Sequence, residues 1–179
     1  MATRLGNLID QLVVAGHTGK IRAAFSRGSP RGPKPPAPAE TKVVCIPARD
    51  EADELAALML VQLLNRRGIG ARVLSSDLLA AEYVKVVESE RPAVACVAAV
   101  PPYGYAHARY LCRRLRTQFA QLKLVGAILT EHDVDELKQR QPPLAADEFA
   151  TSVRQVLRLI GSLVQFREGA AEQPALSSP

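Results

Sequence analysis

The sequence predicts a doubly wound α/β fold, in which helices cover both faces of a parallel β-sheet. From Lys42 onward, short apolar segments alternate with segments of helical spacing, and the connections between them are short. The segment AVACVAAV (93–100) is apolar at every position, as expected of a central parallel strand. Of the 179 residues, 47% are hydrophobic, which is enough for an aliphatic core in one domain.

Five strand–helix units follow one another along the chain. Asp50 and Asp77 are expected to cap two helices, and Gly68 is expected to end the first of them. Right-handed crossovers then favour a flavodoxin-like sheet with strand order 2-1-3-4-5. The expected strands are 43–46, 71–76, 93–100, 122–129 and 148–151. The expected helices are 51–67, 78–90, 105–119, 133–140 and 152–166.

The rest of the chain flanks this domain, which we place at 42–168. Residues 1–25 have helical spacing and form an amphipathic arm, whereas 26–41 are rich in Pro and Gly and read as a linker. The end of the chain, 169–179, is small and polar and is expected to be a disordered tail.

Charge and composition exclude several classes of protein. Residues 1–41 carry six basic and two acidic side chains, so most of the net charge of +5 lies outside the fold. A nucleic-acid-binding domain would carry this charge on the fold, so we expect no specific nucleic-acid partner. The arm could contact anionic lipid. We find neither a secretory signal nor an apolar run long enough to span a membrane, and three cysteines without CxxC spacing indicate the cytoplasm.

The first strand-to-helix turn, PARDEADEL (47–55), lies where this fold usually binds cofactors. It has no glycine, and its carboxylates already complement the helix dipole, so a phosphate would be repelled. We therefore expect no nucleotide or other cofactor here. A well-capped helix start is one interpretation. A polar or cationic ligand held by Asp50 and Asp53 is the alternative.

Side chains near the carboxyl ends of the strands form the predicted ligand cleft. His107 beside two tyrosines could act as an acid–base pair, or it could be a solvated helix residue. No catalytic set accompanies it, so we assign no catalytic residue. The cleft residues are Arg49, Asp50, Asp53, Tyr103, Tyr105, His107 and Thr130.

The helix at 105–119 has a buried stripe and a basic sector. The basic sector is either an ordinary solvated face or a docking face for an acidic partner or lipid headgroups. It consists of Arg109, Arg113, Arg114 and Arg116.

Cysteines and acidic clusters provide no further site. Cys45 and Cys96 lie inside apolar strands, where a buried thiol is inert, and Cys112 has no His or Asp partner by spacing. The acids that follow His132 lack enough companions for a metal site, so we predict none.

Particular segments of the sequence resemble two known families. The first turn is similar to the Asp-x-His-x-x-Gly turn of cobalamin-binding domains, but Ala52 and Leu55 replace the histidine and the glycine. The segments VVCIPARDEADELAALMLVQLLNRRGIGARVL, VACVAAV, AHARYLCRRLRTQFAQLKLVGAIL and AADEFATSVRQVLRLI resemble the C-terminal domain of autoinducer-2 exporter-like (AI-2E) permeases. That resemblance implies a cytosolic α/β domain attached to a membrane transporter, with no catalytic residue to carry over.

Three hypotheses follow. The first is a non-catalytic accessory or regulatory domain of an AI-2E permease, cytoplasmic and at the inner face of the membrane, whose partner is a permease or its transmembrane region. The second is a small-molecule-binding module of the cobalamin-binding type that lacks the cobalt-ligating histidine. The third is an enzyme that uses His107.

Overall fold

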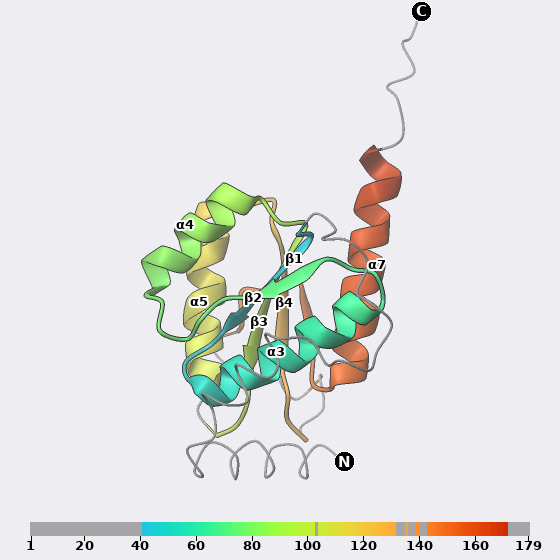
Figure 1. Cartoon of the computed structure of the whole chain (residues 1–179). Helices are drawn as coiled ribbons and strands as arrows, with labels where there is room; N and C mark the ends of the chain where they lie inside the picture. The colour runs from blue at the N-terminus through green and yellow to red at the C-terminus, as the bar shows by residue number, and fades with distance from the viewer. Residues whose placement is uncertain (1–40, 103, 132–134, 136–138, 140–142, 172–179) are drawn as a thin grey trace, which may run out of the picture.

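The computed structural model describes residues 41–171, except 103, 132–134, 136–138 and 140–142, and it describes side chains as far as residue 165. The predicted arm at 1–25, almost all of the linker, and the greater part of the helix expected at 133–140 lie outside the described residues. Figure 1 shows the described part as a sheet flanked by helices.

Strands and helices alternate along the chain, as the sequence predicts (Figure 1). The strands are β1 (Val43–Pro47), β2 (Ala71–Val73), β3 (Val94–Ala99), β4 (Lys123–Ile128) and β5 (Glu148–Ala150). The helices are α3 (Glu51–Arg66), α4 (Ala80–Glu90), α5 (Gly104–Gln118) and α7 (Val153–Ala171).

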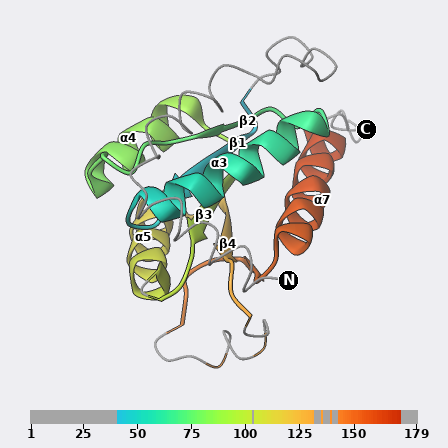
Figure 2. The ribbon, with the colours of Figure 1, turned by 60° about the horizontal axis from the view of Figure 1, so that its bottom comes forward.

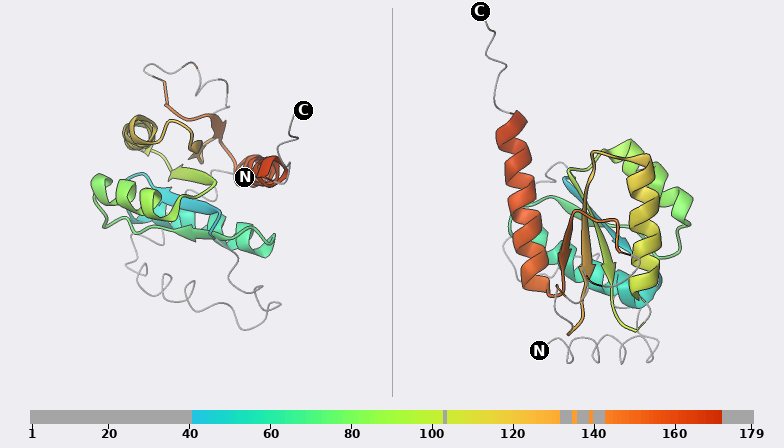
Figure 3. Two further views of the ribbon diagram at one scale, coloured as in Figure 1. Left: turned by 90° about the horizontal axis from the view of Figure 1, so that it is seen from above. Right: turned by 180° about the vertical axis from the view of Figure 1, so that it is seen from behind.

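The five strands form one parallel sheet in the order β2-β1-β3-β4-β5, which confirms the predicted fold class and strand order. Side chains alternate between the two faces of the sheet. Val44 and Ile46 pack with α4 and α5, whereas Val43 and Cys45 pack with α3 and α7. Of the four helices given above, two therefore cover each face, and Figures 2 and 3 show α5 and α7 on opposite sides of the strands.

The central strands are buried on both faces, which explains their uninterrupted apolar sequences. Every residue of β1 and β3 is buried. The largest fully buried side chains come from β1, β3 and β4 and from the helices on both faces, and they include Ile46, Leu60, Leu115, Leu124 and Ile160. Among the described residues, no helix is both long and apolar enough to cross a membrane.

Helix α3 begins and ends as its sequence predicts. The carboxylate of Asp50 accepts hydrogen bonds from the backbone N–H groups of Ala52 and Asp53, at 3.1 and 3.3 Å. At the other end, Gly68 has a φ of 77°, a conformation that favours glycine. Asn65 then joins the helix to β2, because its amide donates to the carbonyl of Ala71 (3.1 Å) and accepts from the N–H of Ala71 (2.8 Å).

The predicted start of the next helix was wrong. Helix α4 begins at Ala80 with Leu79 at the N-cap, so Asp77 does not cap it. Asp77 instead accepts a hydrogen bond from the hydroxyl of Ser75 (3.1 Å), within the preceding turn. The carboxylate of Glu82 reaches back to the N–H of Leu79 (2.7 Å) and takes over part of the capping role.

Candidate functional site

The carboxyl ends of β1 and β3, where this fold usually binds ligands, are occupied by carboxylates from the first turn of α3. Asp50 is partly exposed, caps the helix and forms an ion pair with Arg49 at 3.1 Å. Asp53 and Glu54 have the opposite orientation, since both are buried, at 2% and 5% exposure. From the sequence we expected these acids to line an open ligand cleft, whereas in the structure the side chains of Asp53 and Glu54 face inward.

Asp53 connects α3 to the end of β3. Its Oδ1 accepts a hydrogen bond from the N–H of Val100 at 2.7 Å. Burial raises the pKa of Asp53 to about 7, although the hydrogen bond from Val100 acts in the opposite direction, and the nearby charge of Asp50 adds to the rise. This carboxyl group is therefore close to half-protonated at neutral pH.

Glu54 connects the same helical turn to the loop after β2. One carboxylate oxygen accepts hydrogen bonds from both the N–H and the hydroxyl of Ser76, each at 2.7 Å. The same loop is held from its other side, because the Tyr83 hydroxyl donates to the carbonyl of Ser75 at 2.9 Å. Burial, with the charge of Glu54 next in importance, raises the pKa of Tyr83 to about 12. Glu54 and Tyr83 thus fix the β2–α4 loop against the sheet.

Backbone contacts bring the remaining loops of this edge together. The N–H of Ala48 donates to the carbonyl of Ala98, and the N–H of Leu129 donates to the carbonyl of Ala99, both at 2.9 Å. Helix α5 begins directly against β3, where a Cβ added at Gly104 would lie 2.7 Å from the Cβ of Ala99. Only glycine permits this approach, which leaves little room for a ligand between β3 and α5.

Of the predicted cleft residues, Arg49, Asp50 and Asp53 lie together at the first turn of α3, and the other described ones have different environments. Tyr105 packs against the core cluster beneath α4 and α5, whereas His107 is exposed on α5. The N–H of Thr130 donates to the carbonyl of Thr151 at 3.2 Å, beside β5. Tyr103 lies outside the described residues. Among the described residues of the predicted set, Asp53 is the fully buried one.

The predicted docking face divides into side chains with different environments. Arg116 donates to the carboxylate of Asp147 (2.6 Å) and to two backbone carbonyls, of Ala120 (2.7 Å) and Leu122 (3.0 Å). Burial would raise the pKa of Asp147, but hydrogen bonds from Leu124 and Arg116 outweigh it and lower that pKa. Arg116 therefore joins α5 to the loop before β5. Arg113 is exposed, and Arg109 and Arg114 are half-buried.

The cysteines are buried and free, as predicted for core residues. A hydrogen bond with Cys45, followed by burial, raises the pKa of Cys96 well above its usual value. Burial also raises the pKa of Cys112 to about 12. The thiols of Cys96 and Cys112 therefore stay protonated at neutral pH and are poor nucleophiles. Within the described ranges, no three His, Cys, Asp or Glu residues gather in a way that could hold a metal ion.

Among the described residues, two surface hollows lie along α4 and α5 that the sequence did not predict, although Arg113 and Arg114 of the predicted docking face line the larger one. The larger has a volume of about 530 Å³, and the smaller, of about 440 Å³, follows it toward the C-terminal ends of both helices. Tyr110 lines the larger hollow and is 54% exposed. An exposed aromatic residue on a helix whose other face is already apolar was the signal available in the sequence.

Comparisons with known proteins show a likeness of fold. No protein family and no curated protein matches this sequence. The chain is similar in structure to a CheY-like response regulator receiver domain from Methanospirillum hungatei JF-1, at 17% identity and a TM-score of 0.47 over 73% of this chain and 98% of that one. It is also similar to the signal receiver domain of a putative Luxo repressor protein from Vibrio parahaemolyticus, at 11% identity and a TM-score of 0.48 over 76% of this chain and 100% of that one. A LuxR-family DNA-binding response regulator from Staphylococcus aureus gives 13% identity and a TM-score of 0.43 over 69% and 98%.

These comparisons contradict the resemblance to AI-2E permeases and the functions drawn from it. The three solved structures named above are two receiver domains and a response regulator, and no family model supports a permease-associated domain, a permease partner or a cobalamin-binding module. The physical reason lies in the residues that suggested the resemblance. Buried strands such as VACVAAV and amphipathic helices such as 105–119 are required by any parallel α/β sheet and do not distinguish one family from another.

Proposed function

We propose that this domain is not an enzyme and acts by binding another protein. The observation that carries the proposal is the closed carboxyl edge of the sheet. In this fold the edge is the usual ligand site, and here the buried carboxylates of Asp53 and Glu54 already accept hydrogen bonds from Val100 and Ser76. A ligand would have to break these contacts and leave buried charge without partners, which is costly.

Neither aspartate at this edge of the sheet suits covalent phosphorylation. The carboxylate that accepts a phosphoryl group acts as a nucleophile, so it has to be ionised and accessible. Asp53 is buried, and its pKa is about 7. Asp50 is engaged as the cap of α3 and as the partner of Arg49. Neither aspartate suits this role.

The cysteines bear on the cellular compartment of the protein. Three free, buried thiols support a reducing compartment, and we propose the cytoplasm. The membrane face predicted from the sequence depended on a permease partner and is not retained.

A small-molecule screen tests the proposal. The full chain is melted with ATP, GTP, NADH, FMN and Mg²⁺ at saturating concentrations, and its intact mass is measured after incubation with acetyl phosphate and Mg²⁺. A ligand at one hundred times its dissociation constant adds about 2.7 kcal/mol and raises Tm by several degrees. We expect no such rise and no covalent phosphoryl adduct. A stabilising ligand whose effect disappears in Glu54→Gln, but not in the exposed control Glu51→Gln, would show that the edge is a ligand site.

A further inference from the structure

We infer that the larger hollow between α4 and α5 is the docking groove for an acidic, amphipathic helix of a partner protein. This inference deepens the proposed function, because it names the surface that binds the partner and the chemistry of that partner. The α4–α5 groove, as we call it, is lined by Ala81, Val84, Lys85, Tyr110, Arg113, Arg114, Thr117 and Gln118.

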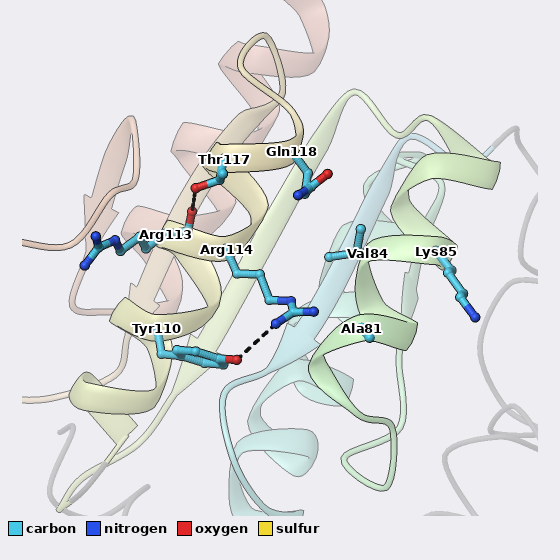
Figure 4. Close-up of a pocket in the computed structure, with 8 residues that line it drawn as sticks. All are labelled: Ala81, Val84, Lys85, Tyr110, Arg113, Arg114, Thr117 and Gln118. Atoms are coloured by element: carbon cyan, nitrogen blue, oxygen red, sulfur yellow. Dashed lines mark hydrogen bonds between the residues drawn. The ribbon is translucent and has the colours of Figure 1, made fainter.

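Apolar and aromatic side chains from both helices form part of the lining of the α4–α5 groove. Ala81 and Val84 come from α4, and Tyr110 comes from α5. Figure 4 shows Val84 extending toward α5, and the Tyr110 ring extending from α5 toward α4. Leu79, the N-cap of α4, is 71% exposed and lies two residues before Ala81. Leu79 and Tyr110 are the large hydrophobic side chains exposed in the described part of the chain; Leu79 caps the start of α4, and Tyr110 lies near the middle of α5.

The polar lining of the groove is basic. Lys85, Arg113 and Arg114 contribute three cations, and none of the described residues that line the groove is acidic. In Figure 4 the Arg114 guanidinium extends into the space between the helices, while Lys85 and Arg113 extend outward on opposite sides. The Tyr110 hydroxyl accepts a hydrogen bond from Arg114 at 3.2 Å, which holds the guanidinium beside the aromatic ring. Tyrosine and arginine are the residue types most enriched among strong contributors to protein–protein binding.

The dimensions suit a helix. Helix α4 has 11 residues and is therefore about 16 Å long, which corresponds to about three turns of a partner helix lying beside it. The second hollow continues the surface along the same two helices, and there Arg91 and Glu88 give it no net charge. A partner helix would place apolar side chains at i, i+3 or i+4 and i+7 over Val84 and Tyr110, and acidic side chains toward the three cations.

Charge and surface chemistry favour a protein over a nucleic acid. A nucleic-acid site needs a broad field of cations that follows the phosphates. Here Arg114 alone of the three cations extends between the helices, Lys85 and Arg113 extend outward at the two sides, and Ala81, Val84 and Tyr110 supply apolar surface. The N-terminal arm of the chain is a poor occupant, because residues 1–41 carry six bases and two acids and would be repelled.

A peptide titration of the full, isotope-labelled chain tests the inference. The probe is a fluorescent 14-residue helical peptide with leucine at i, i+3 and i+7 and glutamate on its remaining surface. One comparison peptide replaces each glutamate with lysine, and another replaces each leucine with alanine. An RNA oligonucleotide and phosphatidylglycerol vesicles serve as the alternative anionic probes. We expect the acidic leucine peptide to bind best and to shift amide resonances along α4 and α5.

Two variants examine the groove itself. Arg114→Glu places an anion in the centre of the groove and should weaken peptide binding about tenfold or more. Tyr110→Ala should weaken it through loss of the apolar contact. Arg158→Glu makes the same charge change on the exposed face of α7 and should leave binding unchanged. Circular dichroism and Tm verify that each variant is folded.

Several outcomes would overturn the inference. These are equal binding of the lysine peptide, resonance shifts confined to other elements, stronger binding of RNA or vesicles, or no binding of any peptide. Absence of peptide binding would rule out the groove as a docking site. It would not affect the proposal that the domain is non-catalytic, because the small-molecule screen tests that proposal separately.

Discussion

Replacement of Asp53 by Asn should make the domain more stable at alkaline pH. Asp53 is 2% exposed, and burial raises its pKa from 3.8 to about 7. Asparagine has nearly the same shape, and its carbonyl oxygen can still accept the hydrogen bond from Val100. The substitution therefore removes the cost of ionising a buried carboxyl group and keeps its principal contact.

The sign and size of the effect follow from proton linkage. Between pH 3.8 and about 7 the folded state holds a proton that the unfolded state has released, so stability falls as the pH rises through this range. A shift of about three pKa units corresponds to about 4 kcal/mol in total at about 1.4 kcal/mol per unit. From pH 5 to pH 8 the wild-type chain should lose about 2.7 kcal/mol that Asp53→Asn does not lose.

Urea unfolding at pH 5 and pH 8, monitored by circular dichroism, measures this difference. With a slope of about 1–3 kcal/mol per molar urea, Asp53→Asn should gain about 1 M or more in midpoint relative to wild type between the two pH values. Glu51→Gln is the control, because Glu51 is exposed in the same helical turn, and its midpoint should follow that of the wild type. An Asp53→Asn midpoint that stays a constant distance from wild type, or falls below it at pH 8, would refute the reasoning.

Two other features yield predictions. Leu60→Ala, in the fully buried face of α3, should lower the free energy of unfolding by about 2–5 kcal/mol through loss of packing. Leu63→Ala is the control and should cost clearly less, because Leu63 is half-buried. Equal urea midpoints for the two variants would show that Leu60 is not buried as the structure has it. Arg116→Met should raise the pKa of Asp147, followed by carboxyl NMR, because it removes a partner that lowers that pKa; an unchanged titration would show that the pair seen at 2.6 Å does not form in solution.

Local sequence signals were sufficient for the sheet. Apolar segments such as 94–99, short connections and the Asp50 cap specify strands and helices without reference to distant residues, and right-handed crossovers then fix their order. The start of α4 was predicted less well, because Asp77 and Glu82 are both plausible capping residues and local hydrogen bonds with Ser75 decide between them.

The candidate site depends on contacts between residues that are distant in the sequence. Asp53 contacts Val100, which lies 47 residues further on, and Glu54 contacts Ser76, 22 residues further on. In the sequence these acids look like the solvated start of a helix, and only the packed sheet shows that they face inward. Arg116 was likewise assigned to a docking face because its partner Asp147 lies 31 residues away. Charge patterns along one helix do not reveal such pairs.

The amide hydrogen exchange of Val100 and Ser76 tests most directly whether the domain closes its own ligand edge. Both N–H groups donate to buried carboxylates at 2.7 Å, although both belong to loops. We expect both amides to exchange as slowly as amides inside β3, and we expect Asp53→Ala to accelerate exchange at Val100 and Glu54→Gln to accelerate exchange at Ser76. Exchange at the rate of an exposed loop in the unmodified protein would contradict this expectation, because the edge would then be open to ligands.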